Sequence, residues 1–229
     1  MVQLNRILGA TLLACGLLSF SFHPALAGCS DKYKVGVDWS GCKKQNKILK
    51  NIDLTGGKFV GADFSSSTLR DSTFDGAAME RVLLVRATLA GASLKAVDLT
   101  KAQGPRANFK NADLTGSNLI KSEFGRARFE DTRLNKSDLS KADFSRAVFT
   151  GADLSDAQMS YSNVARADFR GATLNGVNFT GAYVLLTRFE DTDLSKTTGL
   201  TADQLSVACG NDKTVLPSGL SKPESWPCE

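Results

Sequence analysis

The chain has 229 residues, a mass of 24.5 kDa and a formal net charge of +4, with 23% charged and 42% hydrophobic residues. These values exclude a disordered or collagen-like chain and allow one sizeable core. The only histidine, His23, lies near the N-terminus, so the rest of the sequence excludes histidine-based catalytic triads and imidazole metal sites.

Residues 1–27 have the pattern of a secretory signal peptide, which predicts an exported, periplasmic or secreted protein. Arg6 supplies the positive charge, and residues 7–22 are mainly apolar but too few for a convincing membrane span. Residues 25–27 form an A-x-A cleavage signature. Alternatively, the run ending at Cys29 matches a bacterial lipobox and would anchor a lipoprotein through that residue.

Four cysteines lie beyond this leader, two near each end of the chain. An even number in an exported protein predicts disulfides, and the simplest pairing is Cys29–Cys42 and Cys209–Cys228. Residues 28–46 are therefore predicted to form a disulfide-stapled N-terminal cap, with Trp39 covering the first repeat. The lysines of this region, Lys43, Lys44, Lys47 and Lys50, are interpreted as solvated.

A strict five-residue repeat dominates residues 47–199. From Leu54 to Leu194 every fifth residue is central, and 24 of these 29 positions are Leu or Phe. Two positions earlier the residue is almost always small, as at Ala62 and Ser67. A period of five fits neither an α-helix nor a flat strand, so the chain must turn a corner in every unit.

Units such as Ala112-Asp113-Leu114-Thr115-Gly116 and Ala152-Asp153-Leu154-Ser155-Asp156 read A-(D/N)-L-x-x. They resemble the pentapeptide-repeat family. The resemblance implies an all-β solenoid, a right-handed quadrilateral parallel β-helix with four units per coil and about seven coils.

The sequence supports four sides through a 20-residue super-period. One column of phenylalanines is spaced by 20: Phe109, Phe129, Phe149, Phe169 and Phe189. Gly104 breaks the apolar series without an insertion, and Pro105 follows it. We interpret Gly104-Pro105-Arg106 as a locally distorted corner, either from drift in one tolerant unit or as a ligand notch.

Residues 200–229 are predicted to form a C-terminal helix and a disulfide-tied tail. Thr201 is the expected N-cap, Gln204 its capping-box partner and Gly210 the residue after the helix. Leu200, Leu205 and Ala208 are expected to cover the last coil.

Basic residues also recur every 20 positions and should stack along two neighbouring edges. One column is Arg86, Arg106, Arg126, Arg146 and Arg166, and the second is Arg81, Lys101, Lys121 and Lys141. Arginine forks suit phosphate, sulfate or carboxylate, so these edges are candidates for docking an anionic polymer or an acidic protein. The competing interpretation is neutralisation by nearby acids, namely Asp98, Glu123, Asp138 and Asp143.

No catalytic residues, cofactor or metal site are expected. The carboxylate pairs Glu130-Asp131 and Glu190-Asp191 could support acid–base chemistry in an envelope enzyme. They recur 60 residues apart on the same side, however, which indicates a repeated surface feature and not a catalytic site. The favoured function is therefore a non-enzymatic binding or structural module. A pure scaffold or a protein-interaction rod is the alternative.

Two further kinds of partner are less compatible with this sequence. The family includes DNA-mimicking rods that protect DNA gyrase, but residues 50–196 carry 20 Lys plus Arg against 18 Asp plus Glu, whereas mimicry needs an acidic surface. Nucleic-acid binding through the basic edges lacks an accompanying aromatic platform. Apolar residues at 83, 85 and 183–186 predict either self-association or packing against the cap.

Overall fold

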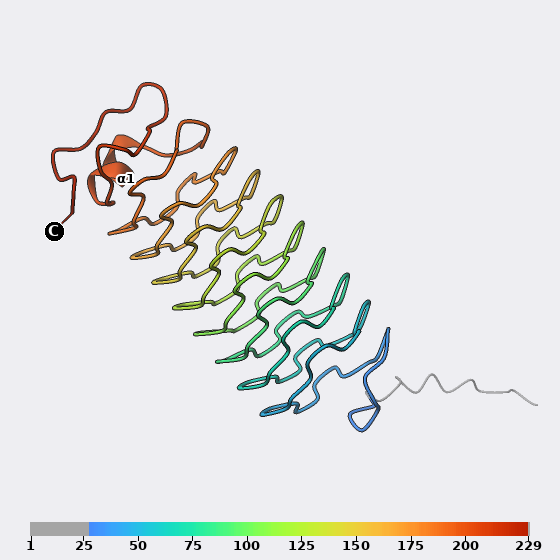
Figure 1. Cartoon of the computed structure of the whole chain (residues 1–229). Helices are drawn as coiled ribbons and strands as arrows, with labels where there is room; N and C mark the ends of the chain where they lie inside the picture. Colours follow the sequence, from blue (N-terminus) through green and yellow to red (C-terminus); the bar gives the residue numbers. More distant parts are fainter. Residues whose placement is uncertain (1–27, 229) are drawn as a thin grey trace, which may run out of the picture.

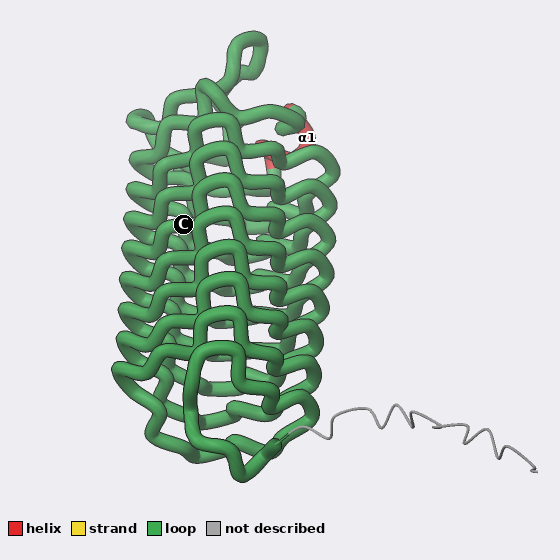
Figure 2. The backbone as a smooth tube through the Cα atoms, turned by 90° about the vertical axis from the view of Figure 1, so that its right-hand side faces the viewer, coloured by secondary structure: helices red, strands yellow, loops and turns green. Residues whose placement is uncertain are grey.

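Residues 28–228 are described by a computed structural model, in which the chain winds into a rod of stacked, four-sided coils (Figure 1). The predicted signal peptide and its cleavage site lie outside the described residues. Each side of a coil contributes one isolated parallel β-bridge, and bridged residues differ by 20 from Asp38↔Lys58 to Asn178↔Thr198. The fold is the expected right-handed, four-sided parallel β-helix. The corners line up in straight columns along the rod (Figure 2).

The backbone of each five-residue unit explains why the coils stack. Three of its five N–H groups donate to neighbouring coils, and a fourth closes the turn. In the unit Phe59–Asp63 these bonds are Phe59 N to Ala78 O at 2.7 Å, Gly61 N to Glu80 O at 2.9 Å, Asp63 N to Cys42 O at 2.9 Å, and Ala62 N to Phe59 O at 2.9 Å. The ladder therefore leaves only the first turn residue of each unit without a partner.

Aspartate or asparagine satisfies this remaining N–H in many units. The bridge residue accepts a hydrogen bond on its Oδ1 from the N–H two residues later, as Asp63 does from Ser65 at 2.9 Å and Asn118 does from Ile120 at 3.0 Å. These are local side-chain-to-backbone bonds that stabilise turns. The D/N position of the repeat is thus a structural requirement of the corner.

Every corner between Gly36 and Asp191 holds one residue at positive φ, with values between 52° and 73°. Glycine supplies only 11 of these 32 positions, so most corners keep a Cβ in the left-handed region at a cost of about 1–2 kcal/mol each. The ladder bonds on both sides of each corner offset this cost. Side chains at this position leave the rod outward, and both basic columns consist of such residues.

The core is a continuous stack of the central apolar residues, which are buried along the whole rod. Phe109, Phe129, Phe149 and Phe169 form a column of nearly parallel rings, with centroids 4.9, 4.9 and 4.8 Å apart. Phe189 continues it at 5.6 Å. These separations equal the spacing of hydrogen-bonded strands, about 4.7–4.9 Å. The predicted aromatic column is confirmed.

The N-terminal end begins differently from the expectation. Regular corners and bridges are present from residue 36, so most of the segment expected as a cap is itself coil. Trp39 occupies a central inward position and packs against Phe59 and Phe64 at centroid distances of 5.9 and 6.3 Å. Lys44 is not simply solvated, because its Nζ lies 3.7 Å from the centre of the Trp39 ring and donates to Cys29 O at 2.7 Å.

The expected distortion at Gly104 is wrong. Its N–H donates to Glu123 O at 2.8 Å, and Arg106 N–H donates to Gly125 O at 3.0 Å, so the ladder continues unbroken. Pro105 stands at the first turn position, whose N–H takes no part in the ladder, and proline therefore removes no bond there. The missing side chain leaves no notch either, because a Cβ on Gly104 would overlap the ring of Phe124.

This packing predicts that Gly104→Leu destabilises the protein although leucine is the commonest central residue. The new side chain must displace the Phe124 ring, at a cost of about 1–3 kcal/mol for an overpacked core. Urea unfolding measures the loss. Gly104→Leu combined with Phe124→Leu should recover much of it, and a stabilising single variant would contradict the packing described.

The C-terminal end closes the rod with a short helix and a tail. Helix α1 (Ala202–Ser206) has the predicted capping box: Gln204 N–H donates to Thr201 Oγ1 at 3.2 Å, and Thr201 N–H donates to Gln204 Oε1 at 2.9 Å. Leu205 is buried against the core. The helix ends with Val207 as its C-cap, so Gly210 is not the residue that terminates it.

Gly210 instead makes room for Trp226, whose ring would overlap any Cβ added there. Trp226 is buried, and its Nε1 donates to Ala208 O at 2.7 Å. The bridges around this cap span 21 residues (Arg188↔Cys209) and 22 residues (Asp193↔Val215). The regular five-residue register therefore ends here. The disulfides Cys29–Cys42 and Cys209–Cys228 link the predicted partners, one at each end.

Candidate anion-binding face

One side of the rod is bordered by both basic columns. We call this side the basic face: it consists of the outward bridge positions 83, 103, 123, 143, 163 and 183 and the two corners that flank them. The arginine column lies along one corner (Arg86, Arg106, Arg126, Arg146, Arg166), and the mixed column lies along the other (Arg81, Lys101, Lys121, Lys141). All nine basic side chains are exposed.

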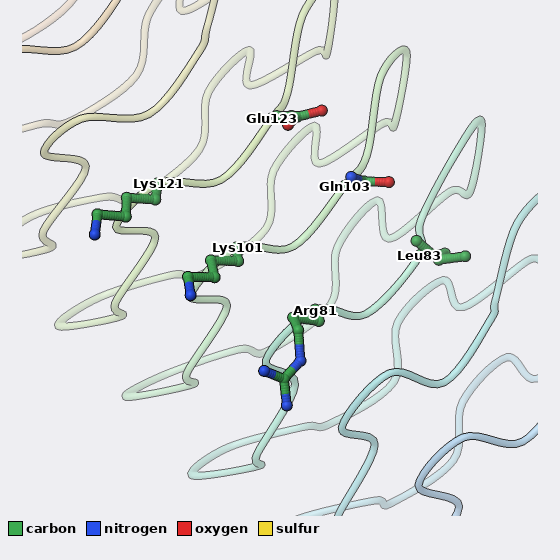
Figure 3. A pocket seen from close by; sticks show the side chains of 6 residues that line it. All are labelled: Arg81, Leu83, Lys101, Gln103, Lys121 and Glu123. Atoms are coloured by element: carbon green, nitrogen blue, oxygen red, sulfur yellow. The ribbon is translucent and has the colours of Figure 1, made fainter.

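An open groove of about 440 Å³ follows part of this face. Arg81, Lys101 and Lys121 line one edge, and the outward row Leu83, Gln103 and Glu123 lies beside them. Figure 3 shows the two rows running in parallel from coil to coil, with each cation next to one residue of the outward row. The groove is therefore elongated along the rod and has cations along one side.

None of the nine basic side chains forms an ion pair within 4.0 Å anywhere in residues 28–228. Beside the arginine column the turn positions hold no acid: Val85, Pro105, Gly125, Ser145 and Ala165. Beside the mixed column Glu80 precedes Arg81, but the two form no ion pair within 4.0 Å. Like charges repeated at the coil spacing repel one another. The columns thus remain unneutralised within the described part of the chain.

The acids expected to neutralise the columns are mostly engaged elsewhere. Asp98 accepts from the backbone and hydroxyl of Thr100 at 2.9 and 2.6 Å. Asp138 accepts from Ser140 N–H at 2.9 Å, and Asp143 from Ser145 N–H at 2.8 Å. The competing interpretation, ion pairs between these acids and the columns, is not seen in residues 28–228: three of the carboxylates complete the turns of their own units. The fourth, Glu123, lies on the outward row beside Lys121 without an ion pair within 4.0 Å.

The opposite side of the rod shows the contrasting pattern. Arg133 and Lys95 both pair with Asp113, at 2.9 and 3.6 Å, and Lys110 approaches Asp131 at 3.9 Å. Exposed pairs of this kind contribute little stability, but they cancel charge locally. The rod is therefore close to neutral in total, while the basic face carries nine of the 14 cations of residues 50–196 that form no ion pair within 4.0 Å.

The hydrogen bonds of the bridge aspartates also lower their pKa. The hydroxyl and N–H of Thr55 lower the pKa of Asp53 below 3.8, and Ser195 does the same for Asp193. Burial alone would raise the pKa of Asp168, but hydrogen bonds from Arg170 and the charges of Arg170 and Arg188 outweigh it, and the pKa is lowered. These groups bind fewer protons in the folded than in the unfolded state.

Stability should therefore be constant from neutral pH to about pH 5 and fall as the pH drops below about 4, through the lowered folded-state pKa values. Urea unfolding from pH 7 to pH 2.5 measures this. The double variant Asp53→Asn/Asp193→Asn should show a weaker acid dependence, because asparagine retains the turn bond, as Asn118 does. A free energy of unfolding that rises between pH 5 and pH 3 would contradict the assignment.

The basic face ends in aromatic and apolar residues that the sequence reading did not connect with it. Tyr161 follows Lys141 at the next position of the mixed column and is 64% exposed. Tyr183, 55% exposed, lies on the outward row and is bridged to Asn163. Leu186 follows Arg166 in the arginine column. The 20-residue spacing of Tyr161 from Lys141 is visible in the sequence, and it places an exposed aromatic residue at the end of the mixed column.

The segment 183–186 divides between inside and outside. Val184 is buried in the core, whereas Leu186 is 39% exposed and its N–H bonds to Val207 O of the cap at 2.6 Å. A second groove of about 350 Å³ begins here and is lined by Arg166, Leu186, Arg188, Glu190, Cys209 and Cys228. The apolar end of the basic face is thus in contact with the C-terminal cap.

The glutamates of the two carboxylate pairs are engaged by arginines. Glu130 pairs with Arg128 at 2.8 Å and Glu190 with Arg188 at 3.2 Å, in each case two residues away along the chain. Within residues 28–228, no group of His, Cys, Asp and Glu side chains is arranged to hold a metal ion. No helix in the same part of the chain combines the length and apolarity needed to cross a membrane.

Comparison with known proteins agrees with this architecture. Residues 48–84 and 83–119 match the family described as pentapeptide repeats (8 copies), and residues 105–179 and 122–198 match the pentapeptide repeat region. The chain belongs to the pentapeptide-repeat family. No curated protein matches its sequence.

Solved pentapeptide-repeat structures are similar to this chain at low identity. HetL from the cyanobacterium Nostoc sp. strain PCC 7120, a protein involved in regulating heterocyst differentiation, is 18% identical over 87% of this chain and 90% of its own, with a TM-score of 0.42. QnrB1, a plasmid-mediated fluoroquinolone resistance protein, is 18% identical over 66% and 82%, with a TM-score of 0.33. A protein of the Arabidopsis thaliana thylakoid lumen is 26% identical over 49% and 74%, with a TM-score of 0.32.

Proposed function

We propose that this pentapeptide-repeat protein is an exported, non-enzymatic module that binds an anionic partner through the basic face. The observation that carries the proposal is that none of the nine corner cations forms an ion pair within residues 28–228, while six other cations of residues 50–196 do. Unpaired arginines one coil apart repel one another. An anion that binds along the column would remove this electrostatic repulsion, which otherwise destabilises the folded protein.

The shape of the face favours an extended partner over a small ligand. The cations form two lines along the rod, and the groove beside the mixed column is elongated and open. A small anion could reach only the cations of one or two coils. A polyanion can contact many coils at once, and its affinity then rises with the number of contacts.

The two disulfides support a location in an oxidising compartment. Together with the secretory pattern of residues 1–27, they favour an exported protein, periplasmic or secreted. Cys29 is engaged with Cys42, which favours the unlipidated form over the lipoprotein. The unpaired positive charge of the face also makes DNA mimicry at gyrase the weaker alternative, since mimicry needs an acidic surface.

The test replaces Arg106, Arg126 and Arg146 together with asparagine, which tolerates positive φ and occupies the same column at Asn46. Binding to immobilised polyphosphate and polygalacturonate should weaken about tenfold or more, with a shallower dependence on salt. Binding is measured at low and moderate ionic strength.

The matched control removes the same charge elsewhere, by changing Lys58, Arg70 and Lys136 to asparagine. These cations are exposed and lie outside the basic face. The control should bind nearly as well as the original protein. Equal losses in both variants would show a general charge effect, and no binding to any polyanion would overturn the proposal.

A further inference from the structure

The tyrosine end of the basic face offers a platform of two exposed aromatic rings, Tyr161 and Tyr183. Tyr161 holds a positive-φ corner, and a Cβ added at Gly181, one coil further along the same column, would lie 2.7 Å from two of its ring carbons. Only glycine therefore lets the ring lie against the next corner. Tyr183 stands on the adjacent outward row. Both rings are largely exposed, at 64% and 55%.

The groups around this platform combine three kinds of chemistry. Arg146 and Arg166 supply charge at the neighbouring corner, and the tyrosine rings supply flat apolar surface. The outward row offers the amide of Asn163, which also donates to Asp143 at 3.2 Å. An acidic sugar presents the matching set: a carboxylate for the arginine fork, a C–H face for an aromatic ring, and hydroxyls for amides.

The repeat distance distinguishes between polymers. The coil spacing, given by the Phe column as 4.8–4.9 Å, sets the distance between successive cations along each corner. It is comparable to the length of one sugar ring in an extended polysaccharide. Duplex DNA places a phosphate at about 3.4 Å along each strand, which does not match the coil repeat.

We propose that the anionic partner of the basic face is a linear acidic polysaccharide of the uronic acid type. It lies along the rod with carboxylates on the two basic columns, and a sugar ring stacks on the tyrosines at the C-terminal end. This inference rests on the proposed function and narrows it to one class of ligand.

The test uses variants that copy residues found at equivalent positions. Tyr161→Gly reproduces Gly61 of the same column, and Tyr183→Asn reproduces Asn163 of the same row, so neither change disturbs the coil. The double variant should bind polygalacturonate about tenfold more weakly, while binding to polyphosphate, which has no rings, stays the same. Tyr33→Asn, a change at an exposed tyrosine outside the face, is the control and should have no effect.

Two ligand series complete the experiment. Methyl-esterified polygalacturonate keeps the sugar backbone without the charge and should not bind. Galacturonate oligomers should gain affinity up to about five residues, one for each coil of the arginine column.

The outcomes separate the inference from the proposed function. Polyphosphate binding that depends on the arginines, without tyrosine-dependent binding of polygalacturonate, would overturn the polysaccharide and leave the anion-binding face. Tighter, tyrosine-dependent binding of single-stranded DNA would overturn it in favour of a nucleic acid. Failure of every polyanion to bind would remove both.

Discussion

Phe129→Ala is expected to lower the free energy of unfolding by about 3–5 kcal/mol, the typical cost of deleting a buried ring. Phe129 is completely buried and stacks between Phe109 and Phe149, with both centroids at 4.9 Å. It also makes edge contacts with Phe124 and Phe144 at 5.9 and 5.8 Å. Removing it leaves a cavity that the surrounding ladder cannot close, because the coil spacing is fixed by hydrogen bonds.

Urea unfolding followed by circular dichroism measures the loss. Phe129→Leu is the matched control, since leucine occupies many central positions, and it should cost less than about 1.5 kcal/mol. Repeat proteins are stabilised by contacts between neighbouring repeats, so a defect in the middle of the rod weakens both halves. A loss below 1 kcal/mol for the alanine variant would contradict the described core.

Breaking the C-terminal disulfide is the second change with a large expected effect. Cys209 and Cys228 are separated by 19 residues, and a crosslink over such a loop stabilises the folded protein by about 3 kcal/mol. The double variant Cys209→Ser/Cys228→Ser should lose this amount. It should also loosen the tail that places Trp226 against Gly210 and Ala208 O.

The two tryptophans report on opposite ends of the rod, which makes the local effect measurable. In the serine variant the fluorescence of Trp226 should shift to longer wavelength at low urea, while Trp39, buried near the other end, should not change. Adding Trp39→Phe isolates the signal of Trp226. An unshifted spectrum together with unchanged stability would show that the tail is held without the disulfide.

The repeat could be predicted from the sequence because every unit places the same kinds of side chain in the core. One large and one small inward side chain per side produce the period of five, and the four sides produce the period of 20. The stacked phenylalanines and both cation columns follow from these two numbers. The ends follow other rules. Lys44 stands at a central position that no further coil of residues 28–228 covers, and its ammonium lies over the Trp39 ring.

The local errors at Gly104 and at the acids have specific causes. Gly104 was read as a gap because sequence spacing does not show that the Phe124 ring of the next coil fills it. The acids were assigned to the cations by distance along the chain. Asp98 and Asp143 instead accept hydrogen bonds from N–H groups of their own turns. The sequence does not show that these N–H groups have no other partner; counting the backbone donors in the structure does.

Mapping the bound polyanion onto the rod tests the central claim most directly. Backbone amide shifts of the labelled protein would be compared before and after addition of polygalacturonate or polyphosphate. The account predicts changes along the outward row 83, 103, 123, 143 and 163 and at the two flanking corners, with the side around Asp113 and Arg133 unaffected. Changes spread evenly over all four sides, or centred on the paired charges of the opposite side, would contradict it.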